Sequence, residues 1–203
     1  APALLSLDGR TPVALYGGQE TAAAIDSEGA ALLMTKSIFK TDGFKPLVAT
    51  LPNNEKIKYV CCCKHFFVVL SNSGKVFIST KKGGYNNFVE QTELSEVKVV
   101  QISGTLEHCF AVTAEGTVYG YGSNDFGKLG CESSVKQLKN FTLINSLQSL
   151  SISSAYAGAS HSLFLTKEGQ VYGHGENQFG KLGIGKEIEN EDKFVEIASL
   201  KSE

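Results

Sequence analysis

The chain of 203 residues contains no tryptophan, one methionine and four prolines, and it has no run of 18 consecutive apolar residues. Without such a run, no membrane-spanning helix is expected. The N-terminal stretch lacks a basic segment followed by an apolar one, so a secretory signal peptide is not expected either. Because the first residue is Ala1 and not Met, we expect a processed form or an excised piece of a longer chain.

An excess of charge is also missing. The formal net charge is −2, and the isoelectric point is about 6.1. Residues 1–54, 55–96, 97–146 and 147–203 carry net charges of −1, +2, 0 and −3. No segment is a basic block that could neutralise a row of phosphates, so a nucleic-acid partner is not expected.

Five cysteines occur, an odd number without the spacing of a disulfide framework. This pattern favours a reducing intracellular compartment, cytoplasmic or nuclear. Three of the five are consecutive, Cys61 to Cys63, and we interpret them as small buried hydrophobic residues. A redox thiol remains an alternative. A zinc site is disfavoured because it needs a C-x₂-C pair and a second pair of ligands, and no metal or other cofactor is expected.

Glycine is abundant, with 21 residues, and the chain holds 12 phenylalanines and 7 tyrosines. This mixture favours short strands joined by tight turns. A glycine-rich phrase occurs twice. VYGYGSNDFGKLG occupies residues 118–130 and VYGHGENQFGKLG occupies residues 171–183, and ten of the thirteen positions are identical. A structural unit that is repeated explains the duplication better than a catalytic loop does.

The repeat extends to four copies. Each copy has an apolar run, a short polar turn that ends in glycine, and a second apolar run, which together predict a β-hairpin whose glycine takes a positive φ. The turns read DSEG, SNSG, TAEG and TKEG, and they end at Gly29, Gly74, Gly116 and Gly169. Another apolar stretch with strand character precedes each hairpin. Residues 141–144 and 193–198 could each supply an outer strand.

This pattern of two apolar runs joined by a glycine turn recurs every 42 to 53 residues. Three or four short strands at that period are typical of a β-propeller blade. We therefore predict an all-β fold with a single propeller-type domain over residues 1–203. Its repeats are expected at about 1–54, 55–96, 97–146 and 147–203. One segment, residues 133–150, could instead carry a helical turn, although we interpret it mostly as loop and strand.

Three linked motifs carry a family resemblance: G-x-x-H-S-x-x-L, E-G-x-V-Y-G-x-G and N-x-F-G-K-L-G. Together they resemble the regulator of chromosome condensation repeat, whose units build seven-bladed β-propellers. The resemblance is strong in the third and fourth repeats and weak in the first two, which lack the histidine and the N-x-F-G-K-L-G tail. The matching positions include His108, His161, Gly122, Gly175, Gly127, Gly180, Gly130 and Gly183.

Four repeats are incomplete relative to a seven-bladed ring, and unclosed blades expose strand edges. The chain could be a segment of a larger propeller, which we favour. Alternatively, a second copy could supply further blades through self-association, or the four units could form a partial arc or a small ring.

The repeated phrase also contains G-x-x-x-x-G-K, the beginning of a phosphate-binding loop. The next residue would have to be serine or threonine, but it is Leu129 in one copy and Leu182 in the other. We therefore interpret the glycines as a structural turn. His108 and His161 occupy equivalent positions, and because a general base would not recur once per blade, we expect each ring to bond backbone near a blade interface.

Two polar segments are candidate partner-contact loops, because loops are where propellers bind. One begins at Lys81 and Lys82 and continues through GGYNN. The other is expected to be a solvated loop over residues 186–193, with the acidic residues Glu187, Glu189, Glu191 and Asp192.

No set of residues predicts catalysis. We therefore expect a non-enzymatic protein-interaction, scaffold or regulatory module. The family resemblance also implies an alternative function, guanine-nucleotide exchange on a Ran-like small GTPase. It implies in addition ultraviolet-B sensing by tryptophans, which a chain without tryptophan cannot perform.

Overall fold

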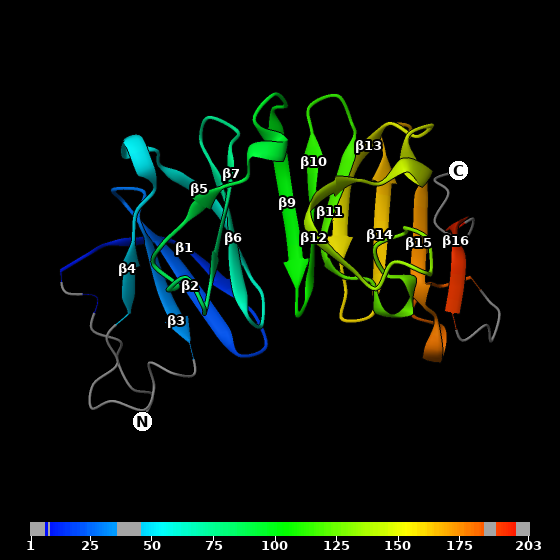
Figure 1. The fold of residues 1–203 in the computed structure, drawn as a ribbon, viewed down its shortest axis with the longest axis horizontal. Coiled ribbons are helices and arrows are strands. Elements are labelled where there is room, and N and C mark those ends of the chain that lie inside the picture. Colours follow the sequence, from blue (N-terminus) through cyan, green and yellow to red (C-terminus); the bar gives the residue numbers. More distant parts are fainter. Residues whose placement is uncertain (1–6, 8, 36–45, 185–189, 198–203) are drawn as a thin grey trace. The chain divides into compact units, whose positions relative to one another are not determined.

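The computed structural model describes residues 7, 9–35, 46–184 and 190–197. They form two compact units, Ala1–Gln91 and Thr92–Glu203. Each unit holds two four-stranded antiparallel sheets, in which neighbouring strands follow one another in sequence (Figure 1). The predicted all-β fold of repeated propeller-type blades is therefore confirmed.

The first unit contains the first sheet, β1 to β4, and the second sheet, β5 to β8. Their strands are β1 Pro12–Gly17, β2 Thr21–Asp26, β3 Ala31–Thr35, β4 Leu47–Ala49, β5 Ile57–Cys62, β6 Phe66–Ser71, β7 Val76–Thr80 and β8 Val89–Glu90. The second unit contains the third sheet, β9 to β12, and the fourth sheet, β13 to β16. Their strands are β9 Val99–Thr105, β10 His108–Thr113, β11 Val118–Ser123, β12 Gln137–Leu143, β13 Ile152–Ala157, β14 His161–Thr166, β15 Val171–Glu176 and β16 Asn190–Glu196.

In the residues that the structure describes, the helical elements are single 3₁₀ turns in the connections. They are η2 Pro52–Asn54, η3 Thr92–Leu94, η4 Asp125–Gly127, η5 Asn145–Leu147 and η6 Gln178–Gly180. Within the part of the chain that the structure describes, no helix has the length and apolar character needed to span a bilayer.

The outer strands of the third and fourth sheets, β12 and β16, include residues 141–143 and 193–196 of the ranges predicted for them, whereas Ile144 and Ile197 lie just beyond the strand ends and residue 198 lies outside the described residues. The ambiguous segment 133–150 contains both structures, because η5 directly follows β12. The expectation of a loop over residues 186–193 is wrong at its end, since β16 begins at Asn190. Its register pairs Gly175 with Glu191. An outer strand is bonded on one side only, so charged residues can occupy it.

Every hairpin turn between the second and third strands has the same internal support. The N–H of each turn glycine donates to the carbonyl three residues earlier, at 3.0 Å for Gly29 and 3.2 Å for Gly169. The side chain of that earlier residue accepts the N–H four residues further on. These side-chain bonds are Asp26 Oδ1 with Ala30 N (2.9 Å), Ser71 Oγ with Lys75 N (3.2 Å), Thr113 Oγ1 with Thr117 N (3.2 Å) and Thr166 Oγ1 with Gln170 N (3.1 Å).

A β-bulge recurs in the first strand of each sheet. In the first sheet Pro12 pairs with Asp26 and Ala14 with Ile25, so that Val13 is the extra residue. The extra residues of the other three sheets are Lys58, Val100 and Ser153. A bulge at one fixed position twists the first strand of each sheet in the same way. This recurrence supports the view that the four sheets are copies of one unit.

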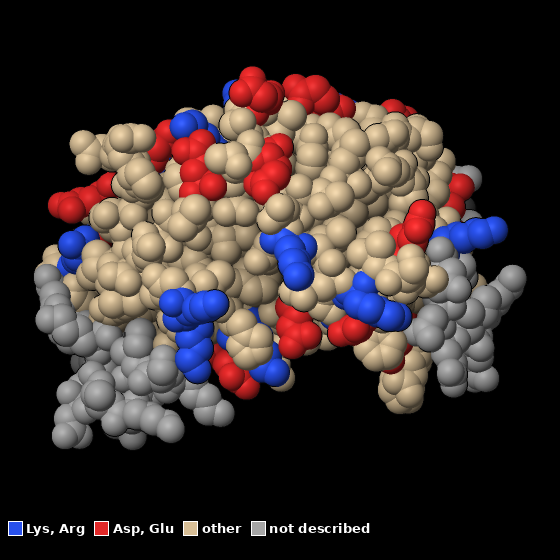
Figure 2. Space-filling view, viewed as in Figure 1, with Lys and Arg blue, Asp and Glu red and all other residues tan. Residues whose placement is uncertain are grey.

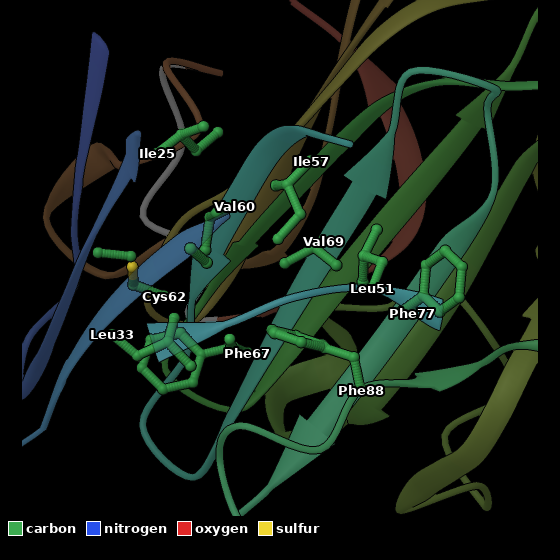
Figure 3. Packing of buried hydrophobic residues seen from close by; sticks show 13 residues of the cluster. Ile25, Leu33, Leu51, Ile57, Val60, Cys62, Phe67, Val69, Phe77 and Phe88 are labelled. Carbon is green, nitrogen blue, oxygen red and sulfur yellow. The ribbon is translucent and has the colours of Figure 1, made fainter. Parts of the chain in front are cut away.

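In each unit, a cluster of buried apolar residues joins the two sheets. In the first unit, Ile25 and Leu33 of the first sheet pack with Val60, Phe67 and Val69 of the second (Figure 3). In the second unit, the cluster consists of Phe110, Val112, Val118, Leu129, Ile144 and Leu147 of the third sheet with Ile152, Ala155 and Phe164 of the fourth. Burial of this apolar surface is the main force that holds neighbouring sheets together.

Candidate interaction surfaces

The repeated glycine phrase ends in a compact turn around a buried asparagine. In the third sheet, Asn124 Oδ1 accepts a hydrogen bond from the N–H of Leu129 at 2.9 Å, and its Nδ2 donates to the carbonyl of Val135 at 2.8 Å. In the fourth sheet, Asn177 Oδ1 accepts from the N–H of Leu182 at 3.0 Å. Asparagine is required here because one side chain must accept and donate at once.

The leucine of each turn lies above the first glycine of the phrase. A Cβ placed on Gly120 would lie 3.2 Å from Leu129 Cδ2, and one placed on Gly173 would lie 3.0 Å from Leu182 Cδ2. Both leucines are buried. The glycine therefore makes room for the side chain that fixes the turn on its own sheet, which explains why these positions occur together in both copies.

The N–H groups that a phosphate would need are used within the turn. Gly127 N donates to the carbonyl of Asn124 at 2.9 Å, and Gly130 N donates to that of Gly127 at 2.8 Å. Together with the bond of Leu129 N, these contacts favour the structural interpretation of the phrase over a nucleotide loop.

Several predicted repeat glycines have positive φ values. They are Gly29 (84°), Gly74 (93°), Gly116 (94°), Gly169 (83°), Gly122 (102°), Gly175 (101°), Gly127 (72°), Gly180 (71°), Gly130 (73°) and Gly183 (66°). At Gly130 the need for glycine is also steric, because a Cβ there would lie 2.2 Å from the Phe194 ring on the fourth sheet. The third-sheet turn therefore reaches onto its neighbour.

The junction between the third and fourth sheets is also polar. The Nε2 atom of His108 lies 3.2 Å from Ser162 Oγ, which donates to the carbonyl of Lys128 at 2.7 Å. Since the hydroxyl has a single proton, His108 Nε2 must be the donor in its bond to Ser162. Two side chains of β9 add support, because Gln101 Oε1 accepts from Ala155 N (2.9 Å) and Ser103 Oγ accepts from Ala157 N (3.1 Å).

The sequence-based expectation for the histidines was wrong in one detail. His108 bonds the side-chain hydroxyl of Ser162 and not backbone. Ser162, the residue that follows His161, faces the His108 ring across the junction. Burial, with contributions from Lys128 and His161, lowers the pKa of His108 to about 3. The ring is therefore neutral at physiological pH. Burial, opposed by Glu176, also lowers the pKa of His161.

Two phenylalanines at the same repeat position face solvent. Phe126 in η4 is 53% exposed and Phe179 in η6 is 91% exposed. Both have a left-handed backbone, with φ values of 62° and 61°, which is uncommon for a bulky residue and often accompanies functional positions. Sequence reasoning treated these residues as repeat markers only, although the recurrence of an aromatic residue in a polar turn was a signal of exposure.

The candidate contact loops are only partly described. Lys81 and Lys82 are exposed in the turn after β7. Behind them, Tyr85 anchors the loop with its ring edge-on to Phe67, at 5.5 Å between centroids. Glu187 and Glu189 lie outside the described residues, and Glu191 and Asp192 belong to β16. On the face drawn in Figure 2, acidic and basic side chains are interspersed among uncharged ones.

The cysteine run lies in the core. Cys61 and Cys62 end β5, Cys63 follows, and all three are buried without disulfides. Burial raises the pKa of Cys62 to about 12. Among the described residues, no three histidine, cysteine, aspartate or glutamate side chains are grouped so that they could hold a metal ion.

Comparison with known proteins identifies the repeat. The family model described as the regulator of chromosome condensation (RCC1) repeat matches residues 115–165, and a second model with the same description matches 99–128 and 152–181. These ranges fall in the third and fourth sheets, where the glycine phrase and the junction histidines lie.

Relatives and solved structures agree with this match. Probable E3 ubiquitin-protein ligase HERC4 of Homo sapiens is 32% identical over 112 residues, which are 54% of this chain and 10% of that protein. Ultraviolet-B receptor UVR8 of Arabidopsis thaliana is 27% identical over 172 residues, which are 79% of this chain and 39% of the receptor.

The structure of Prp20p from Saccharomyces cerevisiae, described with its binding to Gsp1p and histones, superposes with a TM-score of 0.78 at 15% identity. It covers 95% of this chain and 51% of that one, so this chain spans about half of Prp20p and less of the two relatives. At this identity the similarity shows the fold. The third and fourth sheets are therefore similar to the regulator of chromosome condensation repeat, which the two family models match within residues 99–181.

Proposed function

We propose that this chain is a non-enzymatic scaffold or regulatory module that binds protein partners, and that it forms one segment of a larger propeller. Residues 1–203 would then be a single propeller-type domain with repeats at about 1–54, 55–96, 97–146 and 147–203. The packed sheets supply a rigid frame, and the turns between strands present side chains that packing does not require. Rigid frames with exposed turns are typical of binding modules.

The observation that carries the proposal is the pair Phe126 and Phe179. Large aromatic side chains are enriched at the centres of protein interfaces, because they bury much area at low entropic cost. Here the same exposed ring recurs in two repeats on a turn that buried Asn124 and Asn177 hold in place. Such a preorganised turn loses little freedom on binding.

The test is affinity capture that compares the wild-type chain with surface variants. Phe126→Asp and the pair Lys81→Glu and Lys82→Glu change the turn and the candidate loop. Glu168→Lys on the exposed hairpin turn is the matched control. The proposal predicts that at least one captured protein is lost with a turn or loop variant and kept with the control, at unchanged thermal stability. Capture that is insensitive to all of these changes would contradict it.

A second candidate is guanine-nucleotide exchange on a Ran-like small GTPase. The fold similarity to Prp20p supports it, since that protein binds Gsp1p. The test is the release of labelled GDP from Ran and from Gsp1p with and without this chain. Acceleration at micromolar protein supports exchange activity, and unchanged release rates would remove this candidate.

The relatives include enzymes as well as receptors, but the match to HERC4 covers only a tenth of that ligase. We therefore assign no ligase chemistry to this chain. A reducing compartment, cytoplasmic or nuclear, fits its five cysteines, none of which is in a disulfide in the described structure.

A further inference from the structure

The second sheet has an uneven distribution of charge. Residues 56–89 contain no aspartate or glutamate, and their basic side chains include Lys56, Lys58, Lys64, Lys75, Lys81 and Lys82. The two acids that flank this stretch both lie at the end of the sheet where β6 turns into β7. Glu55 accepts a hydrogen bond from Ser73 Oγ at 2.8 Å, and Glu90 pairs with Lys75 at 3.1 Å. The opposite end of the second sheet therefore has lysines but no acid of its own.

Two turns bring basic side chains together at that opposite end. Lys64 and His65 lie in the turn between β5 and β6, and the connection from β7 to β8 begins at Lys81 and Lys82. The N–H of Lys81 donates to the carbonyl of His65 at 3.3 Å, which joins the two turns. Lys64 is half-buried and the other three residues are exposed. Among the residues that the structure describes, these lysines make no ion pair. We call the four residues the basic end of the second sheet.

The neighbouring turn of the first sheet compensates this charge only in part. It connects β1 to β2 and is joined to the second sheet by a bond from Thr21 Oγ1 to the carbonyl of Cys63 at 3.1 Å. Its one acid is the exposed Glu20. Residues 36–45, which follow β3 at the same end, lie outside the described residues. One carboxylate leaves most of the charge of three ammonium groups uncompensated.

The blade itself does not require positive charge at these positions. The same backbone bond joins the two turns in the third and fourth sheets, as Ser123 N with Glu107 O (2.8 Å) and Glu176 N with Ser160 O (3.0 Å). Glu107 therefore stands where the second sheet has His65. In the fourth sheet, Glu176 stands where the second sheet has Lys81. Because the same frame accepts either sign of charge, the lysines of the second sheet are not needed for its fold.

The loop that carries Lys81 and Lys82 is fixed from the core side. The ring of Tyr85 lies edge-on to Phe67, at 5.5 Å between centroids. Phe88 is 4% exposed and belongs to the core cluster in Figure 3. A ligand therefore has to order the lysine side chains but not the backbone of the loop, which lowers the entropic cost of binding.

We propose that the basic end of the second sheet binds an acidic, carboxylate-rich segment of a protein partner. This inference rests on the proposed function and adds the chemistry of the partner. The ammonium groups of Lys64, Lys81 and Lys82 approach separate carboxylates of an extended peptide. Asn86 and Asn87 are exposed in the same loop, and their amide groups add uncharged donors.

The use of lysine favours carboxylates over phosphates. A guanidinium fork grips one phosphate through two parallel bonds, whereas an ammonium group is a point charge. The chain has one arginine, Arg10, and its guanidinium pairs with Asp26. Separate lysines on two turns suit charges that are spaced along a peptide. Nucleic acid is disfavoured, because three lysines release few counterions and the net charge of the chain is −2.

The test is the fluorescence anisotropy of a labelled peptide that alternates glutamate with glycine and is about ten residues long. The full chain is titrated into it at about 0.15 M salt, where distant charges are screened. We expect saturable binding in the micromolar range. Lys81→Glu with Lys82→Glu should weaken binding by about tenfold, and Lys64→Glu by about threefold. The matched control is Lys56→Glu with Lys58→Glu, which changes the net charge equally on exposed residues outside the basic end and should leave the affinity within about twofold.

Three further ligands identify the chemistry that the surface recognises. A peptide with glutamine in place of glutamate should not bind, because it has the same length without the charge. A phosphoserine peptide of equal net charge and a DNA duplex of mixed sequence should bind no more tightly than the glutamate peptide. Thermal unfolding of each variant confirms that a loss of binding is not a loss of fold.

A wild-type chain that does not bind the glutamate peptide would overturn the inference, as would an equal loss of affinity in the two lysine pairs. Tighter binding of the phosphoserine peptide or of DNA through Lys81 and Lys82 would assign the surface to phosphates and overturn it as well. None of these results bears on partner capture through Phe126, so failure here is distinguishable from failure of the proposed function.

Discussion

His108 on β10 and Ser162 on β14 are 54 residues apart in sequence, and they meet across the junction between the third and fourth sheets at 3.2 Å. Both side chains are fully buried. The hydroxyl of Ser162 connects the imidazole to the carbonyl of Lys128 at the end of the glycine phrase. One serine therefore holds together the histidine strand and the turn of the neighbouring repeat.

Replacing Ser162 should destabilise the second unit. Ser162→Ala leaves the His108 ring and the Lys128 carbonyl without this partner, and an unsatisfied buried group costs about 1–3 kcal/mol. Urea unfolding followed by circular dichroism measures the loss, and Ser133→Ala on the exposed loop is the control. If His108→Phe is added, the double variant should be less destabilised than the sum of the single variants. Strict additivity would contradict the contact.

Gly130 and Gly183 form a matched pair for steric packing. Both have positive φ, at 73° and 66°, so alanine is strained at either position. Only Gly130 faces the Phe194 ring at 2.2 Å from an added Cβ, whereas the nearest atom to Gly183 is a methyl carbon of Ile197 at 3.7 Å. Gly130→Ala should therefore be more destabilising than Gly183→Ala by about 1–3 kcal/mol. Equal unfolding free energies would show that the turn does not press on the fourth sheet.

Asp26 should make the first unit sensitive to acid. Burial raises the pKa of its carboxyl, but hydrogen bonds from Ala30, Arg10 and Glu28 outweigh burial and hold the pKa below 3.8. The ionised form therefore stabilises the fold fully above that value, and this contribution is lost as the pH falls through the folded pKa.

Asp26→Asn keeps an acceptor for the turn but loses the charge that pairs with Arg10. It should lower the free energy of unfolding by about 1–3 kcal/mol at pH 7. The difference from wild type should shrink as the pH falls below 3.8 and the carboxyl becomes protonated. If urea unfolding shows the same difference in unfolding free energy between wild type and Asp26→Asn at every pH, the stabilising role of the ionised carboxyl is refuted.

The hairpin turns should depend on one side-chain oxygen. Thr166→Val removes the acceptor for Gln170 N and should destabilise by about 1 kcal/mol. Thr166→Ser keeps the hydroxyl and should remain near the wild type. Thermal and urea unfolding of the two variants give the comparison, and a serine variant as unstable as the valine variant would argue against the hydrogen bond.

The cysteines should react with alkylating reagents in an order set by burial. Cys131 is half-buried, whereas Cys62 is buried and its pKa is raised to about 12. Native-state alkylation followed by mass spectrometry should label Cys131 first and Cys62 at a rate limited by unfolding. Rapid labelling of Cys62 would instead support the redox alternative.

Local patterns predicted much of the fold. The turns that end in Gly29, Gly74, Gly116 and Gly169 lie where the sequence places them, because a polar turn with a positive-φ glycine between apolar runs is a local signal. Residues 141–143 lie in the predicted outer strand, because a short apolar run with β-branched residues is also a local signal. The beginning of β16 did not, because Asn190 joins that strand through its register with Glu176, and local composition there suggests a loop.

The sequence by itself determined the repeat, the hairpins and the structural character of the glycine phrase, since each depends on residues close together in the chain. Only the tertiary structure decided the partner of His108, the burial of Lys128 and the difference in exposure between Phe126 and Phe179. The repeat pattern does not distinguish Lys128 from Lys181, or Phe126 from Phe179, because each pair occupies one repeat position. What distinguishes them is whether another sheet lies against them, and that depends on contacts between residues far apart in sequence.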